Sequence, residues 1–414
     1  MHAAIDLWAN KMKLATLFLS ICASAAAATG VLSPNISDDG IAEALQPYIT
    51  MHELAGAVAL VATKDRIISI TPVGYADVST KKPMKSDSIF WIASMSKPIA
   101  ATAVMILVEE GKVSLDDSVR KYLPDFVPKI MGLAADGIHV VLEPPRHSVT
   151  IRSLLSHTGG ITFRSSLETP TLDAFPLSVR VASYSLEPLM FEPGSDWSYS
   201  NAGINTAARI VEVVSGMKYE EFLQKRLFDP LGMKDTTFWP SHEQLNRLAK
   251  SYKANESGND LEEVSITQLH YPLDDHSHRY PMPAGGLFST AADIARFCQM
   301  LLAGGVYDGK RLLTKVSIEE MSRNQVVDAP QKEIGDSGET SGYGLGWYTS
   351  PSGLIEHSGA YSTNMRVDPR RGLVLIWLVQ HAGFPGDGAR SRDTFENFAN
   401  KHFGSPSIAE LVRH

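Results

Sequence analysis

Four Ser-x-x-Lys sequences occur in this chain of 414 residues, and one of them has the surroundings that nucleophilic catalysis needs. There, Ser94 follows the apolar residues 89–93, and Lys97 precedes a long apolar pattern typical of a helix. Side chains three positions apart lie on one face of a helix, so the Lys97 amine can contact the Ser94 hydroxyl. A desolvated lysine has a lowered pKa and can take or relay the proton that an attacking serine loses. The simpler interpretations are a helix-capping serine and a surface lysine.

The other three Ser-x-x-Lys sequences lie in polar, turn-like stretches. They are Ser79 with Lys82, Ser118 with Lys121, and Ser215 with Lys218. Polar, turn-rich chain normally lies at the surface, so we interpret all three as solvated. Because the pattern occurs four times, the surroundings and not the pattern select Ser94.

Two further short motifs follow later in the sequence. Tyr199 and Asn201 form the only Tyr-x-Asn of the chain, between a turn-rich loop and a helical pattern over residues 202–214. His357 and Gly359 form a His-x-Gly between two strand-like segments. Tyrosine and histidine can transfer protons, and an asparagine amide can hold a polar group from two sides.

In this order the three motifs resemble those of the serine β-lactamases and penicillin-recognising hydrolases. That group includes class C β-lactamases, D,D-peptidases, D-aminopeptidases and family VIII carboxylesterases. The resemblance covers about residues 41–403. Residues 154–160, 283–290 and 343–347 support it.

The third motif departs from the β-lactamase pattern. Class C enzymes carry Lys-Thr-Gly there, whereas this chain has His357-Ser358-Gly359 and no Lys-Thr-Gly or Lys-Ser-Gly anywhere. A His-x-Gly is more similar to the D,D-peptidases, D-aminopeptidases and esterases. We therefore expect weak β-lactam hydrolysis.

The resemblance implies a role for each motif residue. Ser94 is the nucleophile that forms an acyl-enzyme, and Lys97 lowers the pKa of its hydroxyl or relays its proton. Tyr199 is the general base for acylation and the acid for the leaving group, unless it is only a core tyrosine. Asn201 holds the substrate amide or Lys97. His357 takes the place of the family's cation and can be neutral or charged near neutral pH.

Backbone groups complete the site that the resemblance implies. Gly359, which lacks a Cβ, lets the substrate backbone approach the strand. The N–H groups of Ser94 and Ala360 form the oxyanion hole. His157 also belongs to a His-x-Gly, but it precedes the Tyr-x-Asn, so we interpret it as part of a structural loop. The remaining aromatic candidates line the cleft or pack in the core; they are Tyr343, Trp347 and Tyr361.

Strand-like segments at both ends of the chain, with helices between them, indicate an α+β fold. The resemblance implies a β-lactamase/transpeptidase-like architecture, with an antiparallel sheet built from both termini and flanked by helices. We expect a discontinuous sheet domain of residues 36–112 and 288–404. A mostly helical domain of residues 113–287 is inserted in it, and the site lies in the cleft between the two.

Composition and the N-terminal sequence limit the kinds of partner and the location that we expect. The net charge of −8 argues against nucleic acid. Residues 11–28 combine lysines, a short apolar run and small residues, so we expect residues 1–28 to be a signal peptide, with translation from Met1 or Met12. The protein is then secreted or periplasmic, without a stable membrane span; a lipoprotein attached at Cys22 is the weaker alternative.

The cysteine and histidine content also limits the metals and cofactors that we expect. Export would leave Cys298 alone, as a buried thiol. Histidines and aspartates within residues 270–278 are interpreted as a solvated loop, so we expect no metal and no cofactor. The oligomeric state stays open.

Three functions are compatible with these observations. The first is a secreted serine hydrolase that acts through an acyl-enzyme on small esters or on D-amino-acid-containing peptides. The second is a weak class C-like β-lactamase. The third is a catalytically silent penicillin-binding-like protein. The presence of Ser94, Lys97 and Tyr199 argues against the third, because a silent protein is free to lose them.

Overall fold

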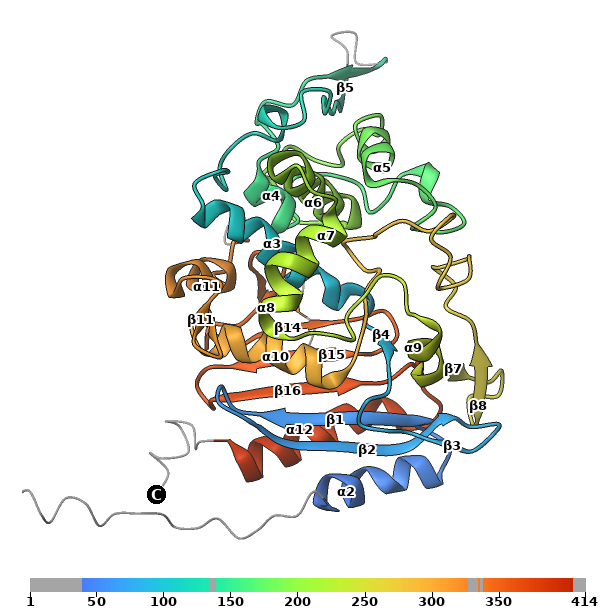
Figure 1. Cartoon of the computed structure of the whole chain (residues 1–414). Coiled ribbons are helices and arrows are strands. Elements are labelled where there is room, and N and C mark those ends of the chain that lie inside the picture. Colours follow the sequence, from blue (N-terminus) through green and yellow to red (C-terminus); the bar gives the residue numbers. More distant parts are fainter. Residues whose placement is uncertain (1–38, 134–138, 327–333, 336–337, 405–414) are drawn as a thin grey trace, which may run out of the picture. The chain divides into compact units, whose positions relative to one another are not determined.

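An antiparallel sheet built from both ends of the chain forms the centre of the fold (Figure 1). The computed structural model describes residues 39–133, 139–326, 334–335 and 338–404, and within them the sheet has eight strands. In spatial order these are β12 (Gly342–Tyr343), β13 (Tyr348–Thr349), β14 (Ile355–Ser358), β15 (Asn364–Asp368), β16 (Leu373–Leu378), β1 (Gly56–Ala62), β2 (Ile67–Asp77) and β3 (Lys82–Pro83). The predicted α+β class and the sheet from both termini are therefore confirmed.

Helices cover both faces of this sheet and make up much of the middle of the chain (Figure 1). In the described residues they are α2 (Asp39–Thr50), α3 (Ser96–Glu109), α4 (Ile151–Leu155), α5 (Leu177–Tyr184), α6 (Asn201–Ser215), α7 (Tyr219–Leu223), α8 (Asp229–Leu231), α9 (His242–Arg247), α10 (Ala291–Leu302), α11 (Lys315–Ser322) and α12 (Ser391–Phe403). Helices α2 and α12 cover one face of the sheet, and α10 covers the other.

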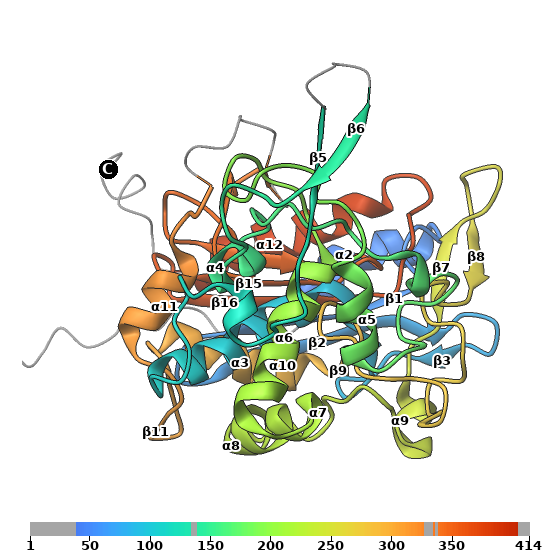
Figure 2. The ribbon, with the colours of Figure 1, turned by 90° about the horizontal axis from the view of Figure 1, so that it is seen from above.

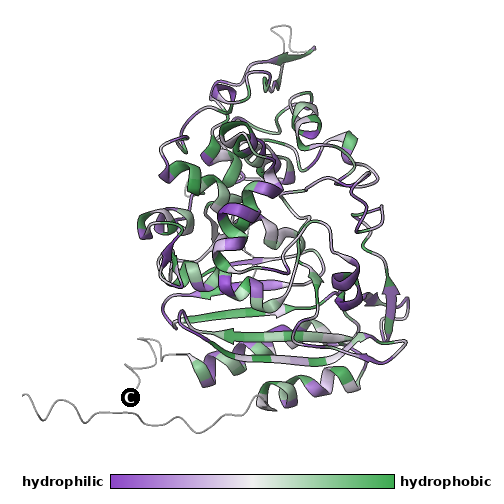
Figure 3. Cartoon of the chain, viewed as in Figure 1, coloured by the Kyte–Doolittle hydropathy of each residue, from purple (hydrophilic) through white to green (hydrophobic). Residues whose placement is uncertain are grey.

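The apolar strand β1 explains why both faces are covered. Successive side chains of a strand point to opposite faces. Val58 and Leu60 join the core that contains α3 and α10, whereas Ala59 and Val61 join the core between the sheet, α2 and α12. All seven residues of β1 are buried, and Figure 3 colours this strand as hydrophobic.

Two hairpins lie in the middle of the chain, where we expected mainly helices. Strand β5 (Ile130–Leu133) pairs with β6 (Val140–Glu143), and β7 (Ser251–Ala254) pairs with β8 (Leu261–Val264) (Figure 2). The turn residues at 255–260 favour the second hairpin, because asparagine, glycine and aspartate tolerate tight turns.

The expected strand over residues 344–349 is shorter than its sequence suggests. Only Tyr348 and Thr349 pair, as β13. The N–H of Gly344 donates to the carbonyl of Trp347, and Gly346 has a φ of 80°, so the first residues form a turn.

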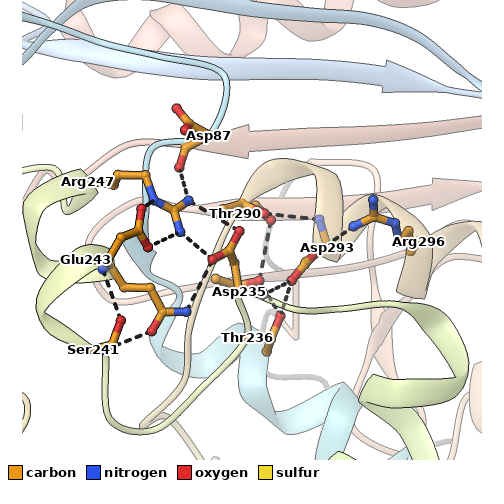
Figure 4. Close-up of polar contacts among 11 residues, drawn as sticks. Asp87, Asp235, Thr236, Ser241, Glu243, Arg247, Thr290, Asp293 and Arg296 are labelled. Carbon is orange, nitrogen blue, oxygen red and sulfur yellow. Dashed lines mark hydrogen bonds and ion pairs between the residues drawn. The ribbon is translucent and has the colours of Figure 1, made fainter.

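A polar network fixes helix α9 beside the start of α10 (Figure 4). Arg247 forms ion pairs with Asp235 and Glu243 and donates to the carbonyl of Asp87 over 2.8 Å. Asp293 accepts the N–H of Asp235 over 2.7 Å. Because α10 lies against β1 and β16, this network links the middle of the chain to the sheet.

Two expectations stay predictions. The signal peptide, residues 1–28, lies outside the described residues. The division at residues 112 and 288 is also untested, and residues from Ile41 onward form one compact unit. None of the described helices is both long and apolar enough to span a membrane.

Candidate active site

The predicted nucleophile lies where a short strand passes into a long helix. Strand β4 (Phe90–Trp91) pairs with β9 (Phe288–Ser289). The chain then turns through the 3₁₀ segment Ala93–Met95 and continues as α3. The apolar segment before the serine is thus a buried strand, as the motif requires, while Ser94 itself keeps a half-buried side chain.

The backbone just before Ser94 is strained. Ala93 has a φ of 45°, in the left-handed region that non-glycine residues rarely adopt. The hydroxyl of Ser96 holds this turn, because it donates to the carbonyl of Ala93 over 2.7 Å and accepts the N–H of Leu287 at 3.3 Å. Strain that the surroundings hold in place is common at sites that present a reactive side chain.

The structure brings Lys97 to Ser94. Lys97 Nζ lies 2.9 Å from Ser94 Oγ, and the Lys97 side chain is fully buried. Burial holds the pKa of Lys97 well below its ordinary value, since the charged amine loses its hydration. An uncharged amine at this distance can accept the hydroxyl proton.

A buried chain of polar groups fixes the second partner of Lys97. Nζ donates to the carbonyl of Ala284 over 2.8 Å, and the N–H of Ala284 donates to Asn205 Oδ1 over 3.1 Å. Asn205 Nδ2 donates to the Tyr184 hydroxyl, which donates to Glu168. Asn205 belongs to none of the sequence motifs described above. Its position one helical turn after Asn201 is the signal that places it near the site.

The Tyr-x-Asn motif lies at the start of α6, beside Lys97. The Ser200 hydroxyl caps this helix, and the Tyr199 ring centroid lies 4.5 Å from Lys97 Nζ. Asn201 is buried, and its Oδ1 has no hydrogen-bond partner in the described part of the chain. A buried acceptor without a partner is costly, and it fits a group kept for a substrate or for Lys97.

His357 lies in β14 as an uncharged, buried imidazole. Its Nδ1 lies 2.8 Å from the carbonyl of Ser358, and its Nε2 lies 3.2 Å from the Tyr343 hydroxyl. Burial lowers the pKa of His357 to about 3, because the charged imidazole would lose its hydration. Of the two charge states expected for this histidine near neutral pH, these surroundings favour the neutral one, because protein groups occupy both ring nitrogens away from water.

Gly359 is needed for close packing. A Cβ at Gly359 would lie 2.2 Å from Thr363 Oγ1 and 2.5 Å from the carbonyl oxygen of Ile92. The protein therefore fills the side of Gly359 toward which a Cβ would point, and the approach of substrate backbone to this strand stays a prediction. The segment that ends at Ala360 thereby lies against the residues before Ser94, and Ala360 N–H has no partner among the described residues.

We expect Gly359→Ala to lower stability and activity together. The new methyl group forces Ile92 and Thr363 apart, and overpacking of this kind costs about 1–3 kcal/mol. Chemical denaturation and ester hydrolysis measure the two effects. The control is Gly338→Ala, because none of the described residues lies within 4 Å of a Cβ there. Equal stability of the two variants would contradict this account.

His157 belongs to the site, contrary to its interpretation as part of a structural loop. Its ring centroid lies 4.7 Å from those of both Tyr199 and Tyr343, and its Nε2 lies 3.1 Å from the Tyr343 hydroxyl. Burial holds the pKa of His157 well below its ordinary value. The available signal was its own His-x-Gly within residues 154–160.

The other candidates lie outside this cluster. Lys121 pairs with Asp117 and not with its Ser-x-x-Lys serine. Trp347 stacks on Phe297, and Tyr361 packs edge-on against Trp91, so both are core residues.

Thiol and metal chemistry add nothing to this cluster. Burial raises the pKa of the Cys298 thiol, as expected for a structural cysteine. The described residues contain no group of three or more His, Cys, Asp or Glu side chains that could hold a metal ion.

Comparison with known proteins agrees with this geometry. The Beta-lactamase family model matches residues 41–396, so the chain belongs to the Beta-lactamase family. It is 27% identical to Esterase EstB of Burkholderia gladioli, over 80% of this chain and 87% of that protein. It is 25% identical to D-alanyl-D-alanine-carboxypeptidase/endopeptidase AmpH of Escherichia coli, over 89% and 91%.

A solved structure supports the fold. EstCE1, described as a hydrolase with promiscuous acyltransferase activity, superposes with a TM-score of 0.71 and 24% identity, over 87% of this chain and 99% of that chain. The β-lactamase/transpeptidase-like architecture implied by the motifs is thus confirmed.

Proposed function

We propose that this protein is an exported serine hydrolase that acts through an acyl-enzyme on small esters or D-amino-acid-containing peptides. The main support for this proposal is the 2.9 Å contact between Ser94 Oγ and the fully buried amine of Lys97. The named activities of related proteins, an esterase and a D-alanyl-D-alanine carboxypeptidase, support the two substrate classes.

The proposed reaction follows from these positions. Uncharged Lys97 takes the Ser94 proton as Oγ attacks the substrate carbonyl. The N–H groups of Ser94 and Ala360 hold the developing oxyanion, and such donors contribute about 3–4 kcal/mol. Tyr199, beside Lys97, gives its hydroxyl proton to the departing alcohol or amine and takes the proton that Lys97 holds. Water then attacks the acyl-enzyme and loses a proton to uncharged Lys97, which returns it to Ser94 Oγ as the acid is released.

The uncharged His357 favours hydrolysis of esters or D-peptides over that of β-lactams. A β-lactam carboxylate that leaves water needs a charged partner, and His357 supplies none. A weak β-lactamase stays the second candidate because of the family match. A silent binding protein has less support, because the three reactive side chains are retained and adjacent.

A substrate panel tests this proposal. We expect measurable kcat/KM for short p-nitrophenyl esters or D-alanyl peptides and much weaker turnover of nitrocefin. The uncharged third-motif histidine is the reason. Nitrocefin turnover near 10⁶ M⁻¹s⁻¹, in the range of efficient enzymes, would establish the β-lactamase alternative. Binding of a labelled penicillin with no turnover of any substrate would favour the silent protein.

A further inference from the structure

Four hydrogen-bond contacts run in one line through three buried side chains beside the motif residues. The N–H of Ser200 lies 3.2 Å from His157 Nδ1, and His157 Nε2 lies 3.1 Å from the Tyr343 hydroxyl. That hydroxyl lies 3.2 Å from His357 Nε2, and His357 Nδ1 lies 2.8 Å from the carbonyl of Ser358. His157, Tyr343 and His357 are each at most 2% exposed.

The two ends of this line fix every proton in it. A backbone N–H only donates, so Nδ1 of His157 is unprotonated and its Nε2 carries the hydrogen. A backbone carbonyl only accepts, so Nδ1 of His357 carries the hydrogen and its Nε2 accepts. The Tyr343 hydroxyl then accepts from His157 and donates to His357. With both imidazoles neutral, a single arrangement satisfies all four contacts.

The surroundings favour neutral imidazoles. Both rings are buried, and burial disfavours the charged form of an imidazole. Lys97, the basic side chain beside Tyr199, has its own pKa lowered by burial. Glu356 precedes His357 but is bonded to Arg366 over 2.9 Å. The other titratable groups facing His357 are Tyr199, Tyr343, Tyr348 and His157.

We propose that His157 and Tyr343 are positioning residues that hold His357 as an uncharged hydrogen-bond acceptor, so that the site takes esters whose leaving group bears no carboxylate. This substrate class rests on the proposed function and narrows it. A carboxylate leaving water needs donors or a cation beside it, and the line engages both nitrogens of His357 inside the protein.

The first experiment determines the tautomers of His157 and His357 and needs no enzyme activity. Long-range ¹H–¹⁵N spectra of protein with ¹⁵N-labelled histidine distinguish Nδ1–H from Nε2–H rings. The chain has 13 histidines, so His157→Asn and His357→Asn assign the two signals. We expect an Nε2–H tautomer for His157 and an Nδ1–H tautomer for His357, both unchanged between pH 6 and pH 8. The opposite tautomer, or a doubly protonated His357 in this range, would overturn the proposal.

The second experiment uses two substrates with the same scissile ester. N-acetyl-D-alanyl-D-lactate carries a carboxylate on its leaving group, and its methyl ester does not. The initial release of N-acetyl-D-alanine measures cleavage of the shared ester bond in both substrates. We expect kcat/KM to favour the methyl ester by about tenfold or more, with a ratio independent of pH from 6 to 8. A preference for the free carboxylate, or a ratio that follows histidine protonation in this range, would refute the substrate class.

Tyr343→Phe tests whether the hydrogen bonds around His357 control the preference between the two substrates. The loss of its hydroxyl leaves His357 Nε2 open to a proton, so the ratio should move toward the carboxylate substrate as pH falls. We also expect kcat to fall about 10–100-fold, as for other supporting hydrogen bonds. Tyr252→Phe is the control, because it removes a buried hydroxyl that bonds only the Val78 N–H among the described residues. A pH-independent ratio in Tyr343→Phe would contradict the role of this hydroxyl.

These readouts separate the two proposals. If no ester or peptide is hydrolysed, the proposed function is wrong. The histidine tautomers still test the hydrogen-bond arrangement of His157, Tyr343 and His357. If Tyr343→Phe does not fold, the wild-type spectra and the substrate pair decide. If esters are hydrolysed but His357 titrates near pH 6.5, the hydrolase stands and the positioning role falls.

Discussion

Ser94→Ala is expected to lower kcat/KM for the preferred ester about 10⁴-fold or more, as removal of a catalytic serine does in other hydrolases. Without Oγ no acyl-enzyme forms, although Lys97 and the backbone donors remain. A fluorophosphonate should label the wild-type peptide that contains Ser94 and should not label the variant. Substrate turnover and mass spectrometry of the labelled peptides measure both effects.

Ser118→Ala provides the matched control for this substitution. Ser118 also precedes a lysine by three positions, but that lysine pairs with Asp117 at the surface. Ser118→Ala should therefore keep wild-type activity and labelling. Labelling at Ser79, Ser118 or Ser215, or full activity of Ser94→Ala, would remove the basis of the proposed mechanism.

Lys97→Met should lower kcat/KM about 10³-fold or more, within the range expected for loss of a general base. Methionine fills a similar volume, so the loss reports the amine and not a cavity. The variant should also change how stability depends on pH. Folding holds the Lys97 pKa below its ordinary value of 10.5, so between these two pKa values the unfolded chain binds one proton more than the folded chain.

In this interval the contribution of Lys97 to the free energy of unfolding rises with pH, by up to about 1.4 kcal/mol per pH unit. Urea denaturation of wild type and Lys97→Met at pH 7.5, 8.5 and 9.5 measures it. The wild type should gain stability relative to the variant at each step. A constant difference would mean that Lys97 is charged in the folded protein and cannot act as the base.

Elements with a strong local pattern could be predicted from the sequence. Helix α3, which the apolar pattern after Lys97 predicts, is such an element, because a long apolar run specifies it locally. Strand β4 is only two residues long and pairs with β9, which is distant in the chain, so no local pattern could define it. The turn at residues 344–347 interrupts an otherwise strand-like run, and the sequence of this run did not indicate the turn.

The site divides in a similar way. Motif spacing predicted the pair of Ser94 and Lys97, because three helical positions fix their proximity. The lowered pKa of His357 could not be predicted, since it depends mainly on burial in the folded protein. Chain order argued against His157, yet folding places it beside Tyr343. A single sequence also cannot reveal that Thr363 and Ile92 fill the space beside Gly359.

The pairing of β1 with β16 has a consequence for the order of assembly. Leu60 lies opposite Ile376, so the sheet cannot close until more than 300 further residues have been synthesised. At about 5–20 residues per second this takes about 15–60 s, during which β1 can pair with β2 on one side while its other edge lacks β16. An apolar strand with one open edge is a site at which chains associate. Since β14 and β15 are also made late, the reactive cluster forms only after nearly the whole polypeptide exists.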